Sequence, residues 1–233
     1  MSLKNEDVFD AFIDNGAYMF NATRLAPTEH EHIQLYYEFM QPKNNDVIVD
    51  MGCGSGEYGY KLNEIDSSLR VINITNDDKM IAFMKNANRE CIHTSYENTT
   101  LADNSADIVM FNESIGHIGL LAIFPEISRI LKNKGLLVIK DFSITHPYKT
   151  TIDLDAWNYT IRQPVELIHV AAQFGFSVES LIHPPIYIKH WYDLMNNNNI
   201  IKQSALQHDP KELPLCTSLY RFIKGGLNGQ SVD

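Results

Sequence analysis

The chain has 233 residues, of which 44% are hydrophobic and 21% are charged, an ordinary globular composition with enough apolar residues for one core. This length suits one α/β domain with a small lid and is short for two full domains. The formal net charge of −10 argues against a default binder of nucleic acid or of an anionic membrane, because both favour basic patches. We therefore expect a small-molecule substrate, no nucleic-acid partner and no stable membrane anchoring.

Three cysteines, Cys53, Cys91 and Cys216, lie far apart in the sequence and form no C-x-x-C pair. This spacing argues against a disulfide framework or a structural zinc site, so we expect no metal, and it suits a reducing compartment. The first residues, MSLKNEDVFDAF, contain no apolar run of signal-peptide length, and no stretch approaches about 18 apolar residues. We expect a soluble, cytoplasmic protein, and a homodimer is one option for its oligomeric state.

Residues 5–40 predict two helices rich in aromatic side chains. Beyond residue 46, short apolar runs predict strands, and amphipathic segments between them predict helices. The expected strands are 46–50, 70–75, 106–112, 135–142, 176–181 and 216–223, and the expected helices are 77–88, 121–135 and 164–175. This alternation indicates an α/β domain with a mostly parallel sheet and helices on both faces.

The same pattern divides the chain into three parts. We expect an N-terminal helical cap or lid at 1–45 and a main domain at 46–224. The main domain carries an insertion at about 182–215, where Pro184, Pro185 and a run of asparagines interrupt the pattern. Residues 225–233 read as a flexible tail.

The stretch DMGCGSGEYG, residues 50–59, follows the first predicted strand and can be read in two registers. Gly54, Gly56 and Gly59 satisfy the G-x-G-x-x-G pattern of a dinucleotide-binding turn. In that turn the first glycine follows its strand at once, and Gly54 comes too late. In the register D-x-G-x-G-x-G, Gly52 lies close behind the strand, and Gly54 and Gly56 let the backbone approach a ligand. The second register fits better and leaves Gly59 as a helix-packing residue.

Asp50 stands at the carboxyl edge of the first strand, where ligands bind in open α/β sheets. A carboxylate beside the loop suits a cationic ligand end, such as the amino group and sulfonium of S-adenosylmethionine. It suits the pyrophosphate of a dinucleotide badly. A glycine-rich turn that serves only packing is the alternative.

VIVDMGCGSG, residues 47–56, resembles the first motif of class I S-adenosylmethionine-dependent methyltransferases. The resemblance extends from about Val47 to Phe222, because residues 105–118 and 126–142 are similar to that family's stretch from its fourth strand into its fifth. It implies a Rossmann-like fold with a mostly parallel, seven-stranded sheet. It also implies S-adenosylmethionine as cofactor, S-adenosylhomocysteine as product, and a cofactor loop that contains Gly52, Cys53, Gly54 and Gly56.

The second strand departs from the usual pattern of this family, in which an acidic residue at the strand end accepts the ribose hydroxyls. VINITNDDKM instead ends the strand in Thr75, followed by Asn76, and looks like the branch of cyclopropane-fatty-acid synthases and terpene and sterol C-methyltransferases. The resemblance implies that Thr75 and Asn76 share the ribose contact and that Met80 is a further cofactor contact. A weakened cofactor site is the alternative.

Two further segments are expected to border the cofactor. Where many relatives place an Asp near the adenine, this chain has Ser95 and Tyr96, which border the adenine or are ordinary loop residues. Asn112, at the end of the strand 106–112, is a candidate for a backbone contact to the cofactor.

FNESIGHIG, residues 111–119, follows the strand whose carboxyl end faces the transferable methyl group in this family. Methyl transfer needs mainly positioning, but a carbon acceptor must also lose a proton or have a cationic intermediate stabilised. Glu113 and His117 share one face if a helical turn begins here, and such a pair can stabilise charge and remove a proton. Their E-S-x-x-H element resembles that of the C-methyltransferase branch. A capping glutamate and a structural histidine are the alternatives.

Tyr18, Trp157 and Tyr159 are candidate substrate contacts, because relatives fold an N-terminal helix over the cofactor and place a lid after the fifth strand. Core packing is the alternative for these side chains. The leading hypothesis is methyl transfer to a small molecule, with a carbon atom or a hydrophobic substrate as options for the acceptor.

Other functions compete with this hypothesis. A non-catalytic cofactor-binding protein is supported by Thr75 and Ser95, which are uncharged where acids are usual. A nucleic-acid methyltransferase is disfavoured, because NESI replaces the [DN]-P-P-[YFW] motif after the fourth strand. An NAD-dependent oxidoreductase is disfavoured by the register of the glycine loop.

Overall fold

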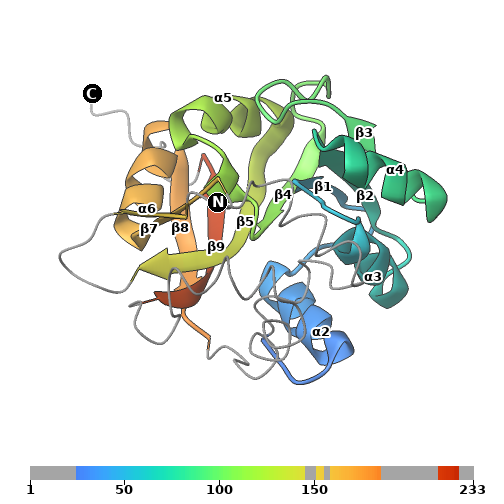
Figure 1. Cartoon of the computed structure of the whole chain (residues 1–233). Coiled ribbons are helices and arrows are strands. Elements are labelled where there is room, and N and C mark those ends of the chain that lie inside the picture. Colours follow the sequence, from blue (N-terminus) through green and yellow to red (C-terminus); the bar gives the residue numbers. More distant parts are fainter. Residues whose placement is uncertain (1–24, 145–150, 155–157, 185–214, 226–233) are drawn as a thin grey trace, which may run out of the picture.

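The computed structural model describes residues 25–144, 151–154, 158–184 and 215–225 (Figure 1). Tyr18 and Trp157 lie outside the described residues, as do most of the expected insertion and nearly all of the expected tail. The boundaries of the cap, the insertion and the tail therefore stay predictions.

The described chain alternates strands and helices from residue 47 onward. The strands are β1 Val47–Met51, β2 Arg70–Thr75, β3 Ile92–His93, β4 Ala106–Asn112, β5 Leu131–Ile144, β6 Thr151–Leu154, β7 Tyr159–Arg162, β8 Phe176–Ile182 and β9 Leu215–Lys224. The helices are α2 Glu29–Met40, α3 Glu57–Ile65, α4 Asp78–Asn86, the short 3₁₀ helix η2 Ile115–His117, α5 Leu120–Ile130 and α6 Pro164–Gln173.

The strands form one sheet whose first five members, in the order β3-β2-β1-β4-β5, are parallel. β9 pairs antiparallel with β5 on one side and with β8 on the other, which completes seven strands. The Rossmann-like α/β fold is thus confirmed. Two strands come in addition: β6 and β7 form a hairpin that joins the end of β5 where Ser143 pairs with Arg162.

Helices cover both faces of the sheet, as Figure 1 shows. Adjacent residues of β4 serve the two faces, because side chains alternate along a strand. Val109 belongs to an apolar cluster with Phe124 of α5 and Leu167 of α6. Ile108 belongs to a second cluster with Tyr36 of α2. Two apolar cores therefore pack against the sheet, one on each face. The carboxyl ends of the parallel strands lie at the sheet edge where a ligand can bind.

Local signals explain where two of the helices begin. α2 starts with a capping box, in which Thr28 and Glu31 satisfy each other's backbone N–H groups. α4 starts after Asp77, whose carboxylate accepts from the N–H groups of Lys79 and Met80 at 2.8 and 3.0 Å.

The helix predicted at 121–135 is shorter than expected. α5 ends at Ile130, and β5 begins at Leu131, which is buried and pairs with Ala106. Gly135 therefore does not end the helix. A Cβ there would lie 2.9 Å from the carbonyl oxygen of Lys132, so the glycine permits a close backbone approach inside the strand. Sheet pairing overrides the helical periodicity of this segment.

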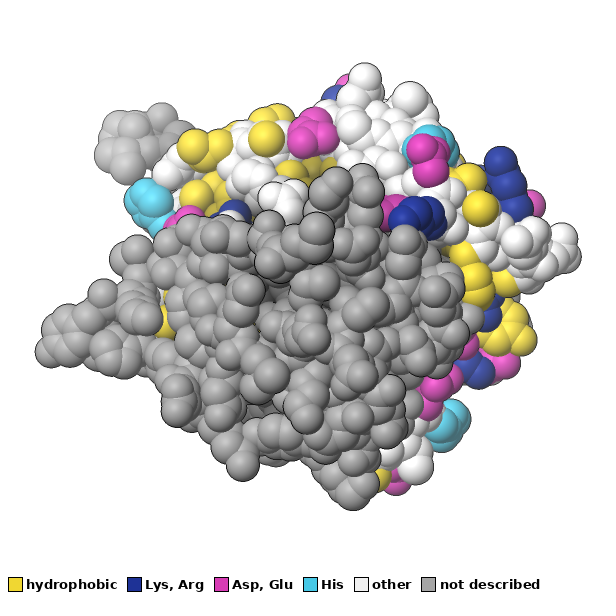
Figure 2. Space-filling view, viewed as in Figure 1, with side chains coloured by type: hydrophobic (Ala, Val, Ile, Leu, Met, Phe, Trp, Pro, Cys, Tyr) yellow, Lys and Arg dark blue, Asp and Glu magenta, His cyan; other side chains and the backbone are white. Residues whose placement is uncertain are grey.

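The described surface mixes charges of both signs, and Figure 2 shows basic side chains beside acidic ones on one face. Arg129 pairs with Asp103 at 2.6 Å, for example. Among the described residues, no helix is both long and apolar enough to cross a bilayer.

Candidate active site

The glycine loop joins β1 to α3 and is tied to the end of β2. The N–H groups of Gly52 and Cys53 both donate to the carbonyl oxygen of Ile74, at 2.9 and 3.0 Å. Gly52, Gly54 and Gly56 have φ angles of 76°, 52° and 70°, in the left-handed region that favours glycine. The sequence therefore needs glycine at these three positions to form the turn.

The glycine loop is tightly packed at Gly52 and has open space at Gly54. A Cβ on Gly52 would lie 2.7 Å from the Cβ of Ser114, whose hydroxyl donates to the Met51 carbonyl at 2.7 Å. A Cβ on Gly54 would meet no described atom within 4 Å. The backbone at Gly54 is thus accessible to a ligand. The prediction for Gly59 is confirmed, because a Cβ there would lie 2.8 Å from the Val71 side chain of β2.

Arg89 holds the outer part of the loop in place. Its guanidinium donates to the carbonyl oxygen of Ser55 at 2.8 Å and pairs with Glu57, at the start of α3, at 2.6 Å. Nothing in the sequence pattern marked Arg89 as a loop residue, because it lies more than thirty positions away.

Asp50 lies at the carboxyl end of β1, and its side chain is buried. Its Oδ1 has no hydrogen-bond partner among the described atoms. Burial in this dry environment raises the pKa of the Asp50 carboxyl to about 7, because the charged form loses its hydration. A cationic ligand group would supply the missing partner.

Tyr36 and Asn112 share this buried corner with Asp50. The negative charge of Asp50 adds to desolvation in raising the pKa of the Tyr36 hydroxyl, while the Asn112 side chain acts in the opposite direction. Both polar atoms of the Asn112 side chain are buried without a hydrogen-bond partner among the described atoms. Nothing in the sequence pattern separates Tyr36 from the other aromatic residues of the N-terminal segment.

Thr75 and Asn76, which are expected to share the ribose contact, differ in their exposure. Thr75 is buried, and its hydroxyl accepts from the N–H of Asp77 at 3.2 Å, whereas Asn76 is exposed. The Asp77 carboxylate caps α4, and Met80 of that helix is buried. Of the two side chains, Asn76 is the one exposed at the end of β2.

Tyr96 and Ser95, the two residues expected near the adenine, differ in their position relative to the glycine loop. The Tyr96 hydroxyl lies 3.4 Å from the position that a Cβ on Gly52 would occupy. Desolvation raises the pKa of Tyr96 to about 12, and a contact with Thr75 opposes this change. Ser95 is exposed. The structure thus brings Tyr96, but not Ser95, to the glycine loop.

Glu113, which immediately follows β4, and Lys140, within β5, form a buried ion pair. Glu113 has a left-handed backbone, with φ 51°, and precedes η2. It therefore does not share a helical face with His117, as a turn beginning at Glu113 would require. Lys140 is fully buried, and its ammonium lies 5.7 Å from the centre of the Tyr58 ring. Sequence reasoning missed Lys140, because it lies within a predicted apolar strand.

Tyr159 connects His117 to Asp141 of β5. The Tyr159 hydroxyl donates to the Asp141 carboxylate, and the ring meets the His117 ring edge-on at 4.7 Å between centres. A Cβ on Gly116 would lie 2.3 Å from the Tyr159 ring, so only glycine fits there. The Nδ1 of His117 lies 3.0 Å from the carbonyl oxygen of Asn158.

Asp141 was not predicted as a site residue. It is buried, and desolvation, followed by the charge of Glu113 as a lesser cause, raises the pKa of its carboxyl to about 7. Its Oδ1 accepts from the N–H of Phe142 at 2.6 Å, and its Oδ2 is buried without a partner among the described atoms. A carboxyl group that changes protonation near neutral pH can accept a proton from a bound molecule.

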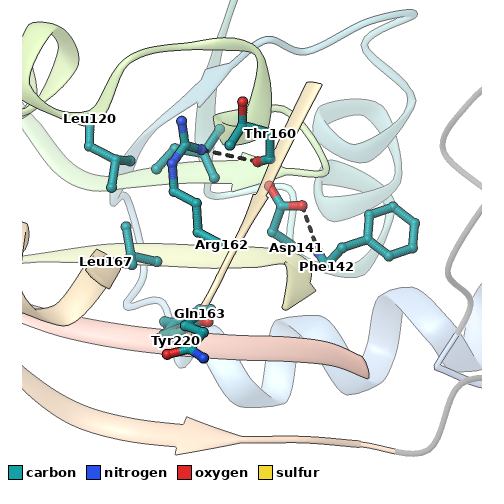
Figure 3. A pocket seen from close by; sticks show the side chains of 9 residues that line it. Leu120, Asp141, Phe142, Thr160, Arg162, Gln163, Leu167 and Tyr220 are labelled. Atoms are coloured by element: carbon teal, nitrogen blue, oxygen red, sulfur yellow. Dashed lines mark hydrogen bonds between the residues drawn. The ribbon is translucent and has the colours of Figure 1, made fainter. Parts of the chain in front are cut away.

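Asp141 also lines a small cavity, shown in Figure 3. The cavity has a volume of about 20 Å³, and roughly 10–15 Å³ is enough for one water molecule. Arg162 reaches it from β7 and donates to the carbonyl oxygens of Thr160 and Ile118 at 3.1 and 3.2 Å. Tyr220 of β9 forms another part of the wall.

Comparison with known proteins identifies the domain. Residues 49–139 match a family described as methyltransferase domain. An uncharacterized protein of Methanocaldococcus jannaschii, MJ0638, is 28% identical over 115 residues, which are 47% of this chain and 46% of that protein. The match thus spans about half the length of this curated relative.

Solved structures with the same fold cover nearly the whole chain. Geranyl diphosphate C-methyltransferase from Streptomyces coelicolor, solved with Mg²⁺, geranyl diphosphate and S-adenosylhomocysteine, has a TM-score of 0.71 and 16% identity, with 94% of this chain and 97% of that chain covered. The [4+2]-cyclase SpnF has a TM-score of 0.73 and 11% identity, with 96% and 97% covered. Residues 49–139 are thus a methyltransferase domain, and the chain has the Rossmann-like fold of S-adenosylmethionine-dependent methyltransferases.

Proposed function

We propose that this chain binds S-adenosylmethionine and transfers its methyl group to a small acceptor molecule. The buried Asp50 carboxylate carries the proposal, because its Oδ1 lacks a hydrogen-bond partner among the described atoms and lies beside a loop that is open at Gly54. A dinucleotide would bring a pyrophosphate to this place, and two like charges would repel each other there.

The residues around the loop fit the parts of this cofactor. Asp50 would bind the cationic end of the cofactor. Asn76 would contact the ribose, with Thr75 packed behind it. The backbone of the glycine loop would lie along the cofactor at Gly52, Cys53, Gly54 and Gly56. Tyr96, Met80 and Asn112 border the same space in the proposal. When bound, the cofactor supplies a methyl group that is already activated by a positively charged sulfur.

The acceptor would lie beyond the ends of β4 and β5, against Glu113, His117 and Tyr159. There the Glu113–Lys140 pair contributes fixed charge, and the buried Asp141 behind Tyr159 is a group that can hold a proton near pH 7. We extend the proposal to a carbon acceptor, because Thr75 and the E-S-x-x-H element resemble the C-methyltransferase branch. The likeness in fold to a geranyl diphosphate C-methyltransferase supports the same direction.

Calorimetry tests the first step of the proposal. The purified chain is titrated with S-adenosylhomocysteine and, separately, with NADH. We expect saturable binding of S-adenosylhomocysteine and none of NADH, with a matching rise in melting temperature. Binding of NADH alone, or of neither compound by folded protein, contradicts the proposal. A screen of small acceptors with methyl-labelled cofactor then identifies the acceptor, and NMR of the product identifies the methylated atom.

A second candidate is a protein that binds the cofactor but does not transfer its methyl group. It is favoured by the end of β2, where Thr75 is uncharged and the Asp77 carboxylate is used to cap α4. The similarity in fold to a [4+2]-cyclase is in line with a different chemistry on this scaffold. Cofactor binding without methyl transfer to any acceptor in a cell extract would favour this candidate.

A further inference from the structure

Folding brings Cys53 and Cys91 together, although they are 38 positions apart in the sequence. Their Sγ atoms lie 3.7 Å apart. Cys53 belongs to the glycine loop, and Cys91 immediately precedes β3. The thioether sulfur of Met84, on α4, lies 3.8 Å from the Sγ of Cys53. The two thiols thus face each other at the border between the loop and the end of β2.

The two thiols differ in access and in chemistry. Cys53 is buried, whereas Cys91 is partly exposed. The hydrogen bond from Cys53 lowers the pKa of the Cys91 thiol, and the same contact raises the pKa of Cys53. The backbone of Thr75 also contacts Cys91 and lowers its pKa further. Desolvation opposes these two effects on Cys91. A partly exposed thiol with a lowered pKa beside a second thiol is the arrangement of redox-sensitive cysteine pairs.

We infer that Cys53 and Cys91 are an oxidative modification site, and that a disulfide between them weakens cofactor binding. The inference rests on the proposed function in one respect, the placement of the cofactor at the glycine loop. It stands on the 3.7 Å separation of the sulfurs, on the access to Cys91 and on the position of Cys53 within that loop.

Hydrogen peroxide is a sufficient oxidant. The Cys91 thiolate attacks one peroxide oxygen and the O–O bond breaks, which leaves a sulfenic acid on Cys91 and releases hydroxide. The Cys53 thiol then attacks the sulfenic sulfur, its proton and the sulfenic OH leave as water, and the S–S bond forms. In total two thiols lose two hydrogen atoms, and one peroxide becomes two waters.

We expect bond formation to displace the loop. A disulfide has a sulfur separation of about 2 Å, so the two sulfurs must approach by on the order of 1.5 Å. The N–H of Cys53 is bonded to Ile74, and its carbonyl oxygen accepts from the N–H of Gly56 at 2.8 Å. A displacement of Cys53 therefore changes the backbone on both sides of Gly54. By reciprocity, a bound cofactor hinders the oxidation.

The test uses the full-length chain, reduced and then freed of reductant. After treatment with hydrogen peroxide, its cysteine peptides are mapped by mass spectrometry without reduction, and S-adenosylhomocysteine affinity is measured by calorimetry before and after. We expect a linked Cys53–Cys91 peptide and binding weaker by on the order of ten-fold or more. Dithiothreitol should reverse both changes, and saturating S-adenosylhomocysteine should protect the pair.

Cys216 provides the matched control, since it is the third and last cysteine of the chain. Cys216→Ser should keep the disulfide and the loss of affinity, and Cys91→Ser should lose both responses. The inference is overturned if peroxide oxidises Cys216 while the pair remains as thiols, or if the disulfide forms and the affinity does not change. Absence of binding by the reduced protein would instead count against the proposed function, and the mapped peptides would still decide whether the pair is oxidised.

Discussion

Tyr159 and Asp141 are joined by a buried hydrogen bond that links the β6–β7 hairpin to the central sheet. Tyr159 is the first residue of β7, and Asp141 lies near the end of β5. Neither residue belongs to the glycine-loop motif. Because Tyr159 also meets the ring of His117, the pair connects the expected acceptor side of the site with a carboxyl group that the sequence pattern did not single out.

Gly116→Ala should displace Tyr159. The new Cβ would lie 2.3 Å from two ring carbons of Tyr159, so the ring or η2 must move. We expect a loss of stability on the order of 1–3 kcal/mol by overpacking, measured by urea denaturation. Gly119→Ala is the matched control: its Cβ meets no described atom within 4 Å, its φ is −69°, and we expect it to behave nearly as the unchanged chain. Equal effects of the two substitutions would refute the packing role of Gly116.

Asp141→Asn should make stability less dependent on pH. The folded pKa of about 7 lies above the unfolded value of about 3.9, so the folded chain holds a proton that the unfolded chain has lost. The stability of the unchanged chain should therefore fall, relative to Asp141→Asn, as pH rises from about 4 to about 7, and the difference should then level off.

Urea unfolding at several pH values measures this difference directly, because the other titrating groups are common to both chains. We expect the variant to gain on the order of 1–3 kcal/mol relative to the unchanged chain between about pH 5 and about pH 8. A constant difference across this range would show that Asp141 does not titrate there in the folded protein.

Lys140→Met should be strongly destabilising, because it removes the buried ammonium that pairs with the Glu113 carboxylate. The expected loss is on the order of 3–5 kcal/mol, and the double variant Lys140→Met with Glu113→Gln should recover a large part of it. Lys132→Met is the control on the same strand. Lys132 pairs with Asp107 at 2.7 Å but is partly exposed, so its loss should cost no more than about 1 kcal/mol. Similar losses for the two lysine variants would argue against a special role of burial.

The sequence allowed prediction of the parts of the fold that depend on local patterns. The strands β1, β2 and β4 follow from short runs rich in apolar residues, and the glycine register follows from the distance between Gly52 and the end of β1. The early end of α5 was missed, because residues 131–134 continue a helical pattern but Leu131 already pairs with Ala106 of β4. The β6–β7 hairpin was missed because its strands have only four residues each.

The functional residues that were missed are those that depend on non-local contacts. Lys140 and Asp141 lie inside a predicted strand, and only the fold shows that Glu113 and Tyr159 reach them. The same holds for Cys91, which contacts Cys53 in the fold where β3 pairs with β2. Periodicity and motif spacing carry no information on such contacts, because they describe neighbours in the sequence.

Asp50→Asn should have opposite effects on folding and on cofactor binding. The buried Asp50 carboxyl has a pKa raised to about 7 with burial as its cause, so the ionised form destabilises the free folded chain above that pH. Removal of the charge should increase stability at about pH 8 by on the order of 1–3 kcal/mol. It should weaken S-adenosylhomocysteine binding by on the order of ten-fold or more, because the cationic amino group loses its partner.

The pH dependence of binding gives a second measure of the same residue. In the unchanged chain the affinity for S-adenosylhomocysteine should rise as pH increases through about 7, since Asp50 becomes ionised, and Asp50→Asn should remove this rise. Calorimetric titrations of both chains between about pH 6 and about pH 8 compare the two directly. A variant that is more stable yet binds as tightly as the unchanged chain would show that Asp50 is buried beside the glycine loop without contacting the cofactor.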